Sequence, residues 1–114
     1  MVTVIIGGKM SEESIKLVTF RCEDSLFLKL EEEAKKANTT KTAIIREAVT
    51  RLLQHSADEI RELSRRNPAC SADYTVSVML PESLIAQLDA IARKVRTSKN
   101  ELMRTALASY FRLV

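Results

Sequence analysis

Two short polar segments carry residue types that are suited to binding anions. They are Asn38-Thr39-Thr40-Lys41 and Arg96-Thr97-Ser98-Lys99, and each precedes apolar residues at helical spacing. Thr40 and Ser98 are well placed to cap a helix, and the free backbone N–H groups at a helix N-terminus favour a phosphate. The residues that we expect to contact phosphate at these two helix starts are Thr40, Lys41, Thr42, Ser98, Lys99 and Asn100. Plain N-capping is the alternative reading, and both roles can hold together.

Two alternating segments carry a second group of candidate residues. Leu17 to Cys22 and Thr75 to Leu80 alternate with period two, which predicts strands with one buried face. The residues predicted on the other, exposed face are Leu17, Thr19, Arg21, Thr75, Ser77 and Met79. An arginine can bond guanine O6 and N7 bidentately, threonine and serine can donate to or accept from base edges, and leucine and methionine can contact only thymine methyls. The alternative is an ordinary solvent face, which an exposed leucine and methionine fit poorly.

The composition argues against an enzyme. The chain has 114 residues, two cysteines and one histidine, which is too few for a disulfide framework, a zinc site or a histidine-based triad. Neither a P-loop nor a dinucleotide-binding glycine pattern is present in the sequence. We therefore expect no catalytic residues, no metal, no cofactor and no small-molecule ligand. We interpret Cys22 as a core residue and Cys70 as an unpaired linker thiol.

An internal repeat organises the chain. At an offset of 58, residues 16–56 align with residues 74–114 without a gap. The identical pairs are Val18/Val76, Ser25/Ser83, Leu26/Leu84, Leu30/Leu88, Ala34/Ala92, Lys36/Lys94, Thr39/Thr97, Lys41/Lys99, Arg46/Arg104 and Ala48/Ala106. They fall on apolar periodic positions and on the polar turn. Two copies of one fold are therefore predicted.

Each repeat is predicted to form a strand followed by two helices. The elements that position the candidate base-contacting and phosphate-contacting residues therefore occur twice. A unit of about 40 residues is too small to bury its own apolar face, but two units together can. We therefore predict one intertwined domain of mainly α class, an intramolecular pseudo-dimer in which a two-stranded antiparallel ribbon lies over four helices. The expected division is an N-terminal extension at 1–15, repeat one at 16–54, a helical extension and linker at 55–73, and repeat two at 74–114.

The segment after repeat one continues the apolar stripe. Apolar residues keep helical spacing up to the stop at Asn67-Pro68, and they are Leu52, Leu53, Ala57, Ile60 and Leu63. This spacing predicts that the second helix of repeat one extends to residue 66. The extension is either a lid on the core of the same chain or an interface between protein units. The first 15 residues could add a strand, cover the core, or form an arm. No apolar run is long enough to span a membrane, and a cytoplasmic protein is expected.

The order strand–helix–helix resembles the ribbon-helix-helix family of DNA-binding proteins, which includes the Arc and MetJ repressors and CopG-like plasmid copy-number repressors. The matching segments are LVTFRCEDSLFLKLEEEAKKANTTKTAIIREAV and TVSVMLPESLIAQLDAIARKVRTSKNELMRTAL. Two units in one chain resemble the TraY-type tandem arrangement, and similar regulators occur in archaea and their viruses.

Three departures from the family pattern stand out. Asn38 and Arg96 occupy the inter-helix turn where glycine is frequent, so the turn of repeat two is expected to be remodelled. Leu17 and Met79 stand where polar base-reading residues are usual. Two acids near the end of the first strand, Glu23 and Asp24, are unfavourable close to phosphate.

The resemblance implies a sequence-specific regulator of transcription, a repressor, that binds double-stranded DNA by placing the ribbon in the major groove of an operator. The six exposed ribbon residues would then contact bases, and the six residues at the helix starts would contact phosphates. Because the two strands differ, one chain should read an asymmetric site, and self-association of chains on DNA would create any palindrome. The alternatives are a DNA-coating or plasmid-transfer accessory protein and, from another class, an antitoxin-like protein-interaction module.

Overall fold

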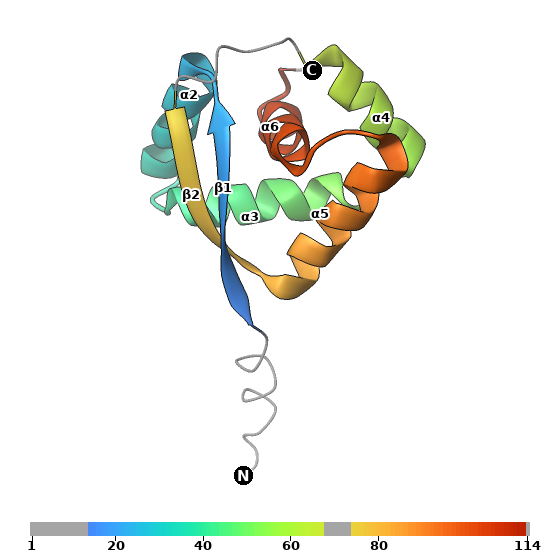
Figure 1. The fold of residues 1–114 in the computed structure, drawn as a ribbon. Helices are drawn as coiled ribbons and strands as arrows, with labels where there is room; N and C mark the ends of the chain where they lie inside the picture. Colours follow the sequence, from blue (N-terminus) through green and yellow to red (C-terminus); the bar gives the residue numbers. More distant parts are fainter. Residues whose placement is uncertain (1–13, 68–73, 114) are drawn as a thin grey trace.

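The computed structural model describes residues 14–67 and 74–113 and contains two β-α-α units with one additional helix between them (Figure 1). The elements in chain order are β1 (Ile15–Cys22), α2 (Asp24–Lys36), α3 (Lys41–Leu52), α4 (Ala57–Arg66), β2 (Tyr74–Pro81), α5 (Glu82–Val95) and α6 (Lys99–Tyr110). The mainly α class with a short antiparallel ribbon is confirmed. The N-terminal extension up to residue 13, the return loop 68–73 and Cys70 lie outside the described residues. No helix in the described ranges is long and apolar enough to cross a membrane.

The register of the ribbon reveals an internal two-fold axis. β1 and β2 pair antiparallel, with Thr19 opposite Ser77. These two residues are also equivalent at the repeat offset of 58, so a pseudo-two-fold axis runs between them and perpendicular to the ribbon. Their hydroxyl oxygens lie 3.3 Å apart, within hydrogen-bonding distance. The predicted pseudo-dimer is thus a single chain folded with near two-fold symmetry.

The two repeats exchange their packing partners. The helix α6 of repeat two packs against β1 of repeat one, α3 of repeat one packs against β2, and α3 and α6 pack against each other. The buried face of the ribbon supplies Val18, Phe20, Cys22, Val76, Val78 and Leu80 to one apolar core. The prediction that Cys22 is a core residue is confirmed by its complete burial. Neither repeat could retain this core alone, because each strand is covered by a helix from the other repeat.

The turns between the paired helices have the same backbone shape in both repeats. Asn38 and Arg96 both adopt left-handed conformations, with φ of 55° and 59°. The expectation that the turn of repeat two is remodelled is therefore wrong. Arg96 accepts a conformation that costs a non-glycine residue about 1–2 kcal/mol, because the following N-cap and helix are held in place by the core.

The extension after repeat one is a separate helix, so the expected continuous helix to residue 66 is wrong. α3 ends at Leu52, and α4 begins after Ser56 with a capping box. In this box the Ser56 hydroxyl accepts from the Glu59 N–H at 3.2 Å and the Glu59 carboxylate accepts from the Ser56 N–H at 2.9 Å. The latter bond lowers the pKa of Glu59 below its ordinary value. The stop signal is local polar sequence, which overrides the apolar spacing.

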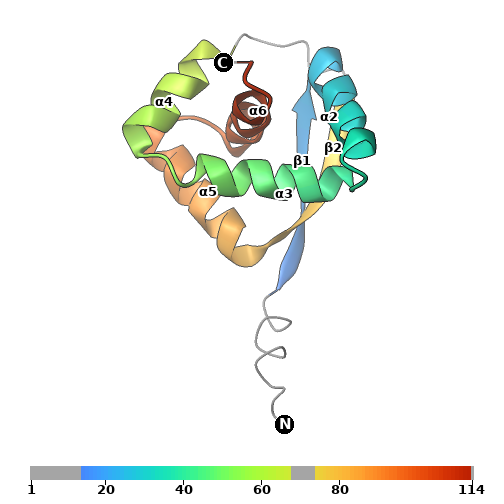
Figure 2. The same ribbon diagram turned by 180° about the vertical axis from the view of Figure 1, so that it is seen from behind.

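The helix α4 is a lid on the core of its own chain, one of the two alternatives left open by the sequence. It packs against α5 and α6 (Figure 2), buries Ile60 completely, and ends where Asn67 Nδ2 donates to Thr105 Oγ1 at 2.7 Å. The repeats differ accordingly at this face. Repeat two has Ile91, Val95, Thr105 and Ala108 at the positions where repeat one has Glu33, Ala37, Glu47 and Thr50. The two glutamates of the half without a lid, Glu33 and Glu47, are thus replaced by the uncharged Ile91 and Thr105 on the covered half.

Candidate nucleic-acid interface

The outer face of the ribbon brings all six predicted base-contacting residues together. The alternating burial along both strands leaves each of them exposed, as the period-two pattern predicts. The register joins them into three cross-strand pairs, which are Leu17–Met79, Thr19–Ser77 and Arg21–Thr75. Opposite residues on one face of an antiparallel pair have Cβ atoms about 5 Å apart. The six side chains therefore form one continuous strip.

The outer edge of β1 at Arg21 is bonded to a side chain of repeat two. The side-chain oxygen of Asn100 accepts from the backbone N–H of Arg21 at 2.8 Å, and its amide donates to the Arg21 carbonyl at 3.3 Å. Because both backbone groups of Arg21 point to Asn100, the Arg21–Thr75 pair is of the non-hydrogen-bonded type, in which side chains lie closest. Asn100, predicted to contact phosphate, thus also anchors the ribbon edge to the start of α6.

The starts of α3 and α6 flank the ribbon, and both predicted N-caps are confirmed. The Thr40 hydroxyl accepts from the Ala43 N–H, and the Ser98 hydroxyl accepts from the Glu101 N–H, each at 3.1 Å. Each start also carries a lysine in an ion pair with the preceding helix. Lys41 lies 3.6 Å from Glu31 and Lys99 lies 3.2 Å from Asp89, two pairs related by the pseudo-two-fold axis. Such partly exposed pairs are worth at most about 1 kcal/mol, so a phosphate can compete for the lysine.

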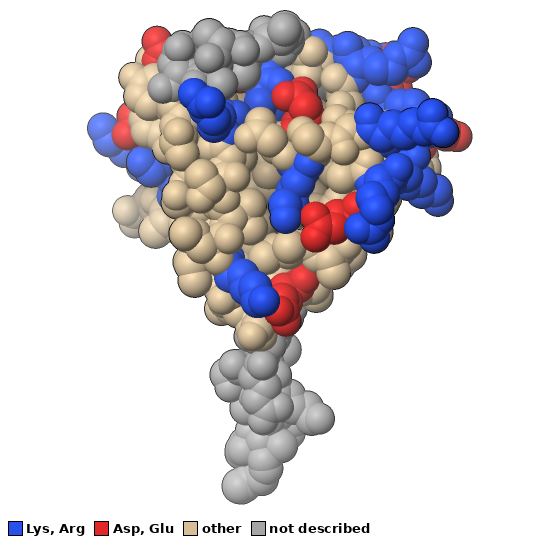
Figure 3. All heavy atoms as spheres, viewed as in Figure 1, with Lys and Arg blue, Asp and Glu red and all other residues tan. Residues whose placement is uncertain are grey.

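Further basic residues surround these helix starts. Arg93, Lys94 and Arg96 precede α6, and the equivalent positions before α3 hold Lys35, Lys36 and Asn38. Figure 3 shows Lys and Arg side chains gathered over α4 and the end of α5, on the right of the view. On α4, however, Arg61, Arg65 and Arg66 pair with acids of the same helix. The arginines of α4 are therefore paired within their own helix, whereas Lys41 and Lys99 are paired with the helices that precede them.

The equivalent arginines of the two repeats have different environments. Arg104 is buried in α6, where its guanidinium donates to Glu101 at 2.8 and 2.6 Å and to Glu23 at 3.2 and 3.4 Å. Burial opposes the charge, but the hydrogen bonds to Glu23 and Glu101 prevail and raise the pKa of Arg104. Glu23, which looked unfavourable near phosphate, therefore has a structural partner.

Arg46, the equivalent of Arg104 in repeat one, is a further candidate DNA-contacting residue that the sequence patterns did not indicate. The positions of the two acids are occupied in its half by Pro81 and Ala43. Arg46 is exposed, and its Nη2 lies 3.5 Å from the carbonyl oxygen of Met79 at the ribbon edge. Only the pairing of the two arginines by the repeat could have directed attention to it, because burial is not visible in the sequence.

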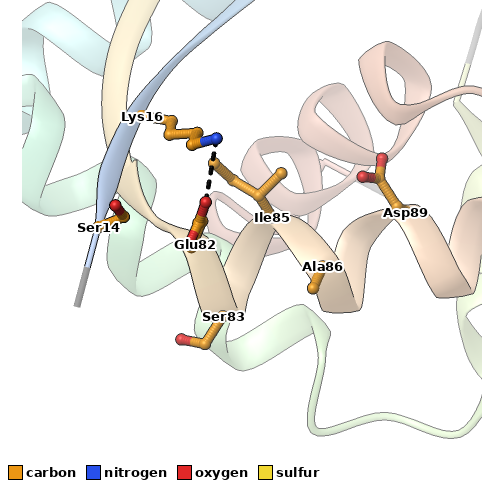
Figure 4. A pocket seen from close by; sticks show the side chains of 7 residues that line it. All are labelled: Ser14, Lys16, Glu82, Ser83, Ile85, Ala86 and Asp89. Atoms are coloured by element: carbon orange, nitrogen blue, oxygen red, sulfur yellow. Dashed lines mark ion pairs between the residues drawn. The ribbon is translucent and has the colours of Figure 1, made fainter.

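A groove of about 650 Å³ lies beside one end of the ribbon (Figure 4). It is lined by Ser14, Lys16, Glu82, Ser83, Ile85, Ala86 and Asp89. Lys16 and Glu82 form an ion pair of 3.0 Å across it. At the equivalent place in the other half, Phe27 and Tyr74 stack with ring centroids 4.5 Å apart. The groove thus arises because Ile85 and Lys16 stand where the other half has two stacked aromatic rings.

Comparison with known protein families gives two matches within the chain. The family model described as ribbon-helix-helix protein, copG family, matches residues 16–56 and again residues 74–113, together more than two thirds of the chain. The matches coincide with the two β-α-α units and exclude α4. No curated protein and no solved structure matches the chain significantly.

Proposed function

Because the chain belongs to the CopG family of ribbon-helix-helix proteins, with two units in tandem, we propose that it is a sequence-specific transcriptional regulator that binds double-stranded DNA and represses its target. Members of this family are typically DNA-binding regulators of transcription. The regulator would act in the cytoplasm, and the ribbon would enter the major groove of an operator.

The observation that carries this proposal is the strip of six exposed side chains on a ribbon whose two strands come from one chain. A two-stranded ribbon fits the major groove of B-DNA, where the pattern of donors and acceptors distinguishes all four base pairs. In the proposed complex Arg21 bonds a guanine, Thr19, Thr75 and Ser77 meet base edges, and Leu17 and Met79 meet thymine methyls. The strip is chemically asymmetric, so the site read by one chain is not a palindrome.

The two helix starts would bind the phosphates on either side of the groove. At the start of α3 the phosphate would be bound by Thr40, Lys41 and Thr42. At the start of α6 it would be bound by Ser98, Lys99 and Asn100. Phosphate contacts set the position of a protein on DNA without reading sequence. The similar surroundings of the two starts, each with a hydroxyl cap and a half-buried lysine, support a contact on both sides.

Lys99→Ala should weaken binding to all DNA sequences by the same factor. Because one phosphate contact is lost, the slope of log affinity against log salt concentration should become shallower by about 0.9. The measurement is a fluorescence-anisotropy titration of specific and unrelated duplexes at several salt concentrations. Arg65→Ala is the matched control, since it removes an exposed, ion-paired cation from α4. A loss confined to one sequence would contradict the phosphate assignment of Lys99.

The direct test of the function is a selection of binding sites from random duplexes, followed by footprinting at two salt concentrations. A short, asymmetric or tandemly repeated motif is expected, and the footprint length gives the number of chains that associate on it. No enriched motif, with binding lost at moderate salt, would contradict the proposal. A long continuous footprint without sequence preference would identify a DNA-coating protein, and co-purification of a neighbouring gene product without DNA binding would identify an antitoxin-like module.

A further inference from the structure

The outer face of the ribbon is divided into two chemically different ends. At one end Leu17 is 63% exposed and Met79 is 45% exposed, and the register places them opposite each other. Exposed apolar surface is unfavourable in water, by about 25 cal/mol for each Å². A single exposed leucine or methionine would be unremarkable, but here the two side chains form one apolar patch. Ile15, which is 53% exposed and two residues before Leu17 on the same strand, extends it, and the other four predicted base-contacting residues are polar.

The opposite end of the same face is charged and hydrogen-bonding. Arg21 pairs with Thr75, and the Thr19–Ser77 hydroxyl pair separates this end from the apolar patch. Asn100 holds the Arg21 backbone by two hydrogen bonds, so the position from which the guanidinium projects is fixed by α6. The three pairs thus run from apolar, through hydroxyl, to cationic along the strip.

The pseudo-two-fold axis gives this order a consequence for DNA binding. Rotation about the axis between Thr19 and Ser77 places Leu17 on the position of Thr75 and Met79 on the position of Arg21. The backbone could therefore enter the groove equally well in either of two opposite orientations. The side chains would not fit the same site in both orientations, because the rotation exchanges the apolar patch with the arginine.

We propose that the ribbon reads its operator through two subsites, a thymine-methyl subsite under Leu17 and Met79 and a guanine subsite under Arg21, and that this order selects one orientation of the chain on DNA. The proposal rests on the proposed function. Arg21 lies four positions after Leu17 along β1, which corresponds to about 13 Å at about 3.3 Å per residue. The two subsites therefore lie at most about four base pairs apart, because base pairs are spaced 3.4 Å along the helix axis and the major groove runs obliquely to that axis.

The test uses duplexes that carry the motif enriched by the selection experiment, altered one base at a time. Deoxyuridine in place of thymidine removes only the methyl group, and 7-deazaguanine in place of guanine removes only the N7 acceptor. We expect deoxyuridine to weaken binding about fourfold at one or two positions at one end of the motif. We expect 7-deazaguanine to weaken binding about tenfold near the other end.

Two protein variants assign each effect to its residues. In the double variant Leu17→Ala Met79→Ala, deoxyuridine should have no effect while 7-deazaguanine keeps its full effect. In Arg21→Ala, 7-deazaguanine should have no effect while deoxyuridine keeps its full effect. All three side chains are exposed, so both variants should keep the wild-type unfolding midpoint, which circular dichroism checks.

Two outcomes overturn the proposal while leaving the proposed function intact. One is specific binding that is insensitive to deoxyuridine at every position. The other is methyl sensitivity that survives in the Leu17→Ala Met79→Ala variant, since the methyls would then be read by other residues. The absence of any enriched motif in the preceding selection would instead refute the proposed function itself. The two failures are therefore distinguished by whether the unmodified motif exists.

Discussion

Arg104→Met is expected to lower the free energy of unfolding by about 3 kcal/mol, the largest effect that we predict for a single substitution. The Arg104 side chain is only 2% exposed and neutralises two carboxylates, those of Glu23 and Glu101. Removing the guanidinium leaves both acids close together without a counter-charge. The expectation lies at the lower end of the range for buried pairs, because Glu23 and Glu101 are 25% and 38% exposed and water can partly solvate them.

The repeat provides the matched control for this substitution. Arg46→Met changes the equivalent arginine, at the same position of the equivalent helix, but Arg46 is exposed, and Pro81 and Ala43 stand at the positions of the two acids. Its effect on stability should stay within about 0.5 kcal/mol. The free energy of unfolding of both variants is measured by urea denaturation, with circular dichroism as the signal. Equal effects of the two substitutions would show that the Glu23–Arg104–Glu101 cluster does not hold the repeats together.

Arg21→Ala is expected to weaken binding to the selected operator by about 1–3 kcal/mol, roughly 5- to 150-fold. The preference for guanine at one position should disappear at the same time. The fold should survive, because the hydrogen bonds between Arg21 and Asn100 use the backbone of Arg21 and not its side chain. The measurement is a competition titration with the operator and with duplexes that carry each of the four base pairs at the affected position.

Arg21→Lys separates base reading from charge. Lysine keeps the positive charge but cannot form the two parallel bonds of a guanidinium. We expect Arg21→Lys to retain binding to unrelated DNA while losing most of the guanine preference. If Arg21→Ala leaves both affinity and preference unchanged, the face assigned to DNA is incorrect.

The local features of this chain follow from its sequence because they depend on neighbours a few residues apart. Period-two alternation identified the exposed residues of both strands, including Arg21. The Thr and Ser before each second helix identified the N-caps at Thr40 and Ser98. The gapless repeat identified the two units, and the size of each unit implied that they share one core.

Two predictions from the sequence were wrong, the first because a local capping signal was overlooked and the second because packing between distant parts of the chain decides the conformation. Apolar spacing through Leu53 and Ala57 favoured one long helix, but the capping box at Ser56 starts a new helix that packs on α5 and α6. The preference of arginine against a left-handed conformation favoured a remodelled turn at Arg96, but the packed helices on both sides impose the same turn as in repeat one.

The arrangement of the candidate site was decided by tertiary structure alone. Leu17 and Met79 are 62 positions apart in sequence and become one patch only through the register of the two strands. Arg46 and Arg104 are equivalent in sequence, yet Arg104 alone of the two is buried, where it bonds Glu23, 81 residues away. Alternation and capping are local and can be read from a sequence, whereas pairing register and burial depend on which distant residues the folded core brings into contact.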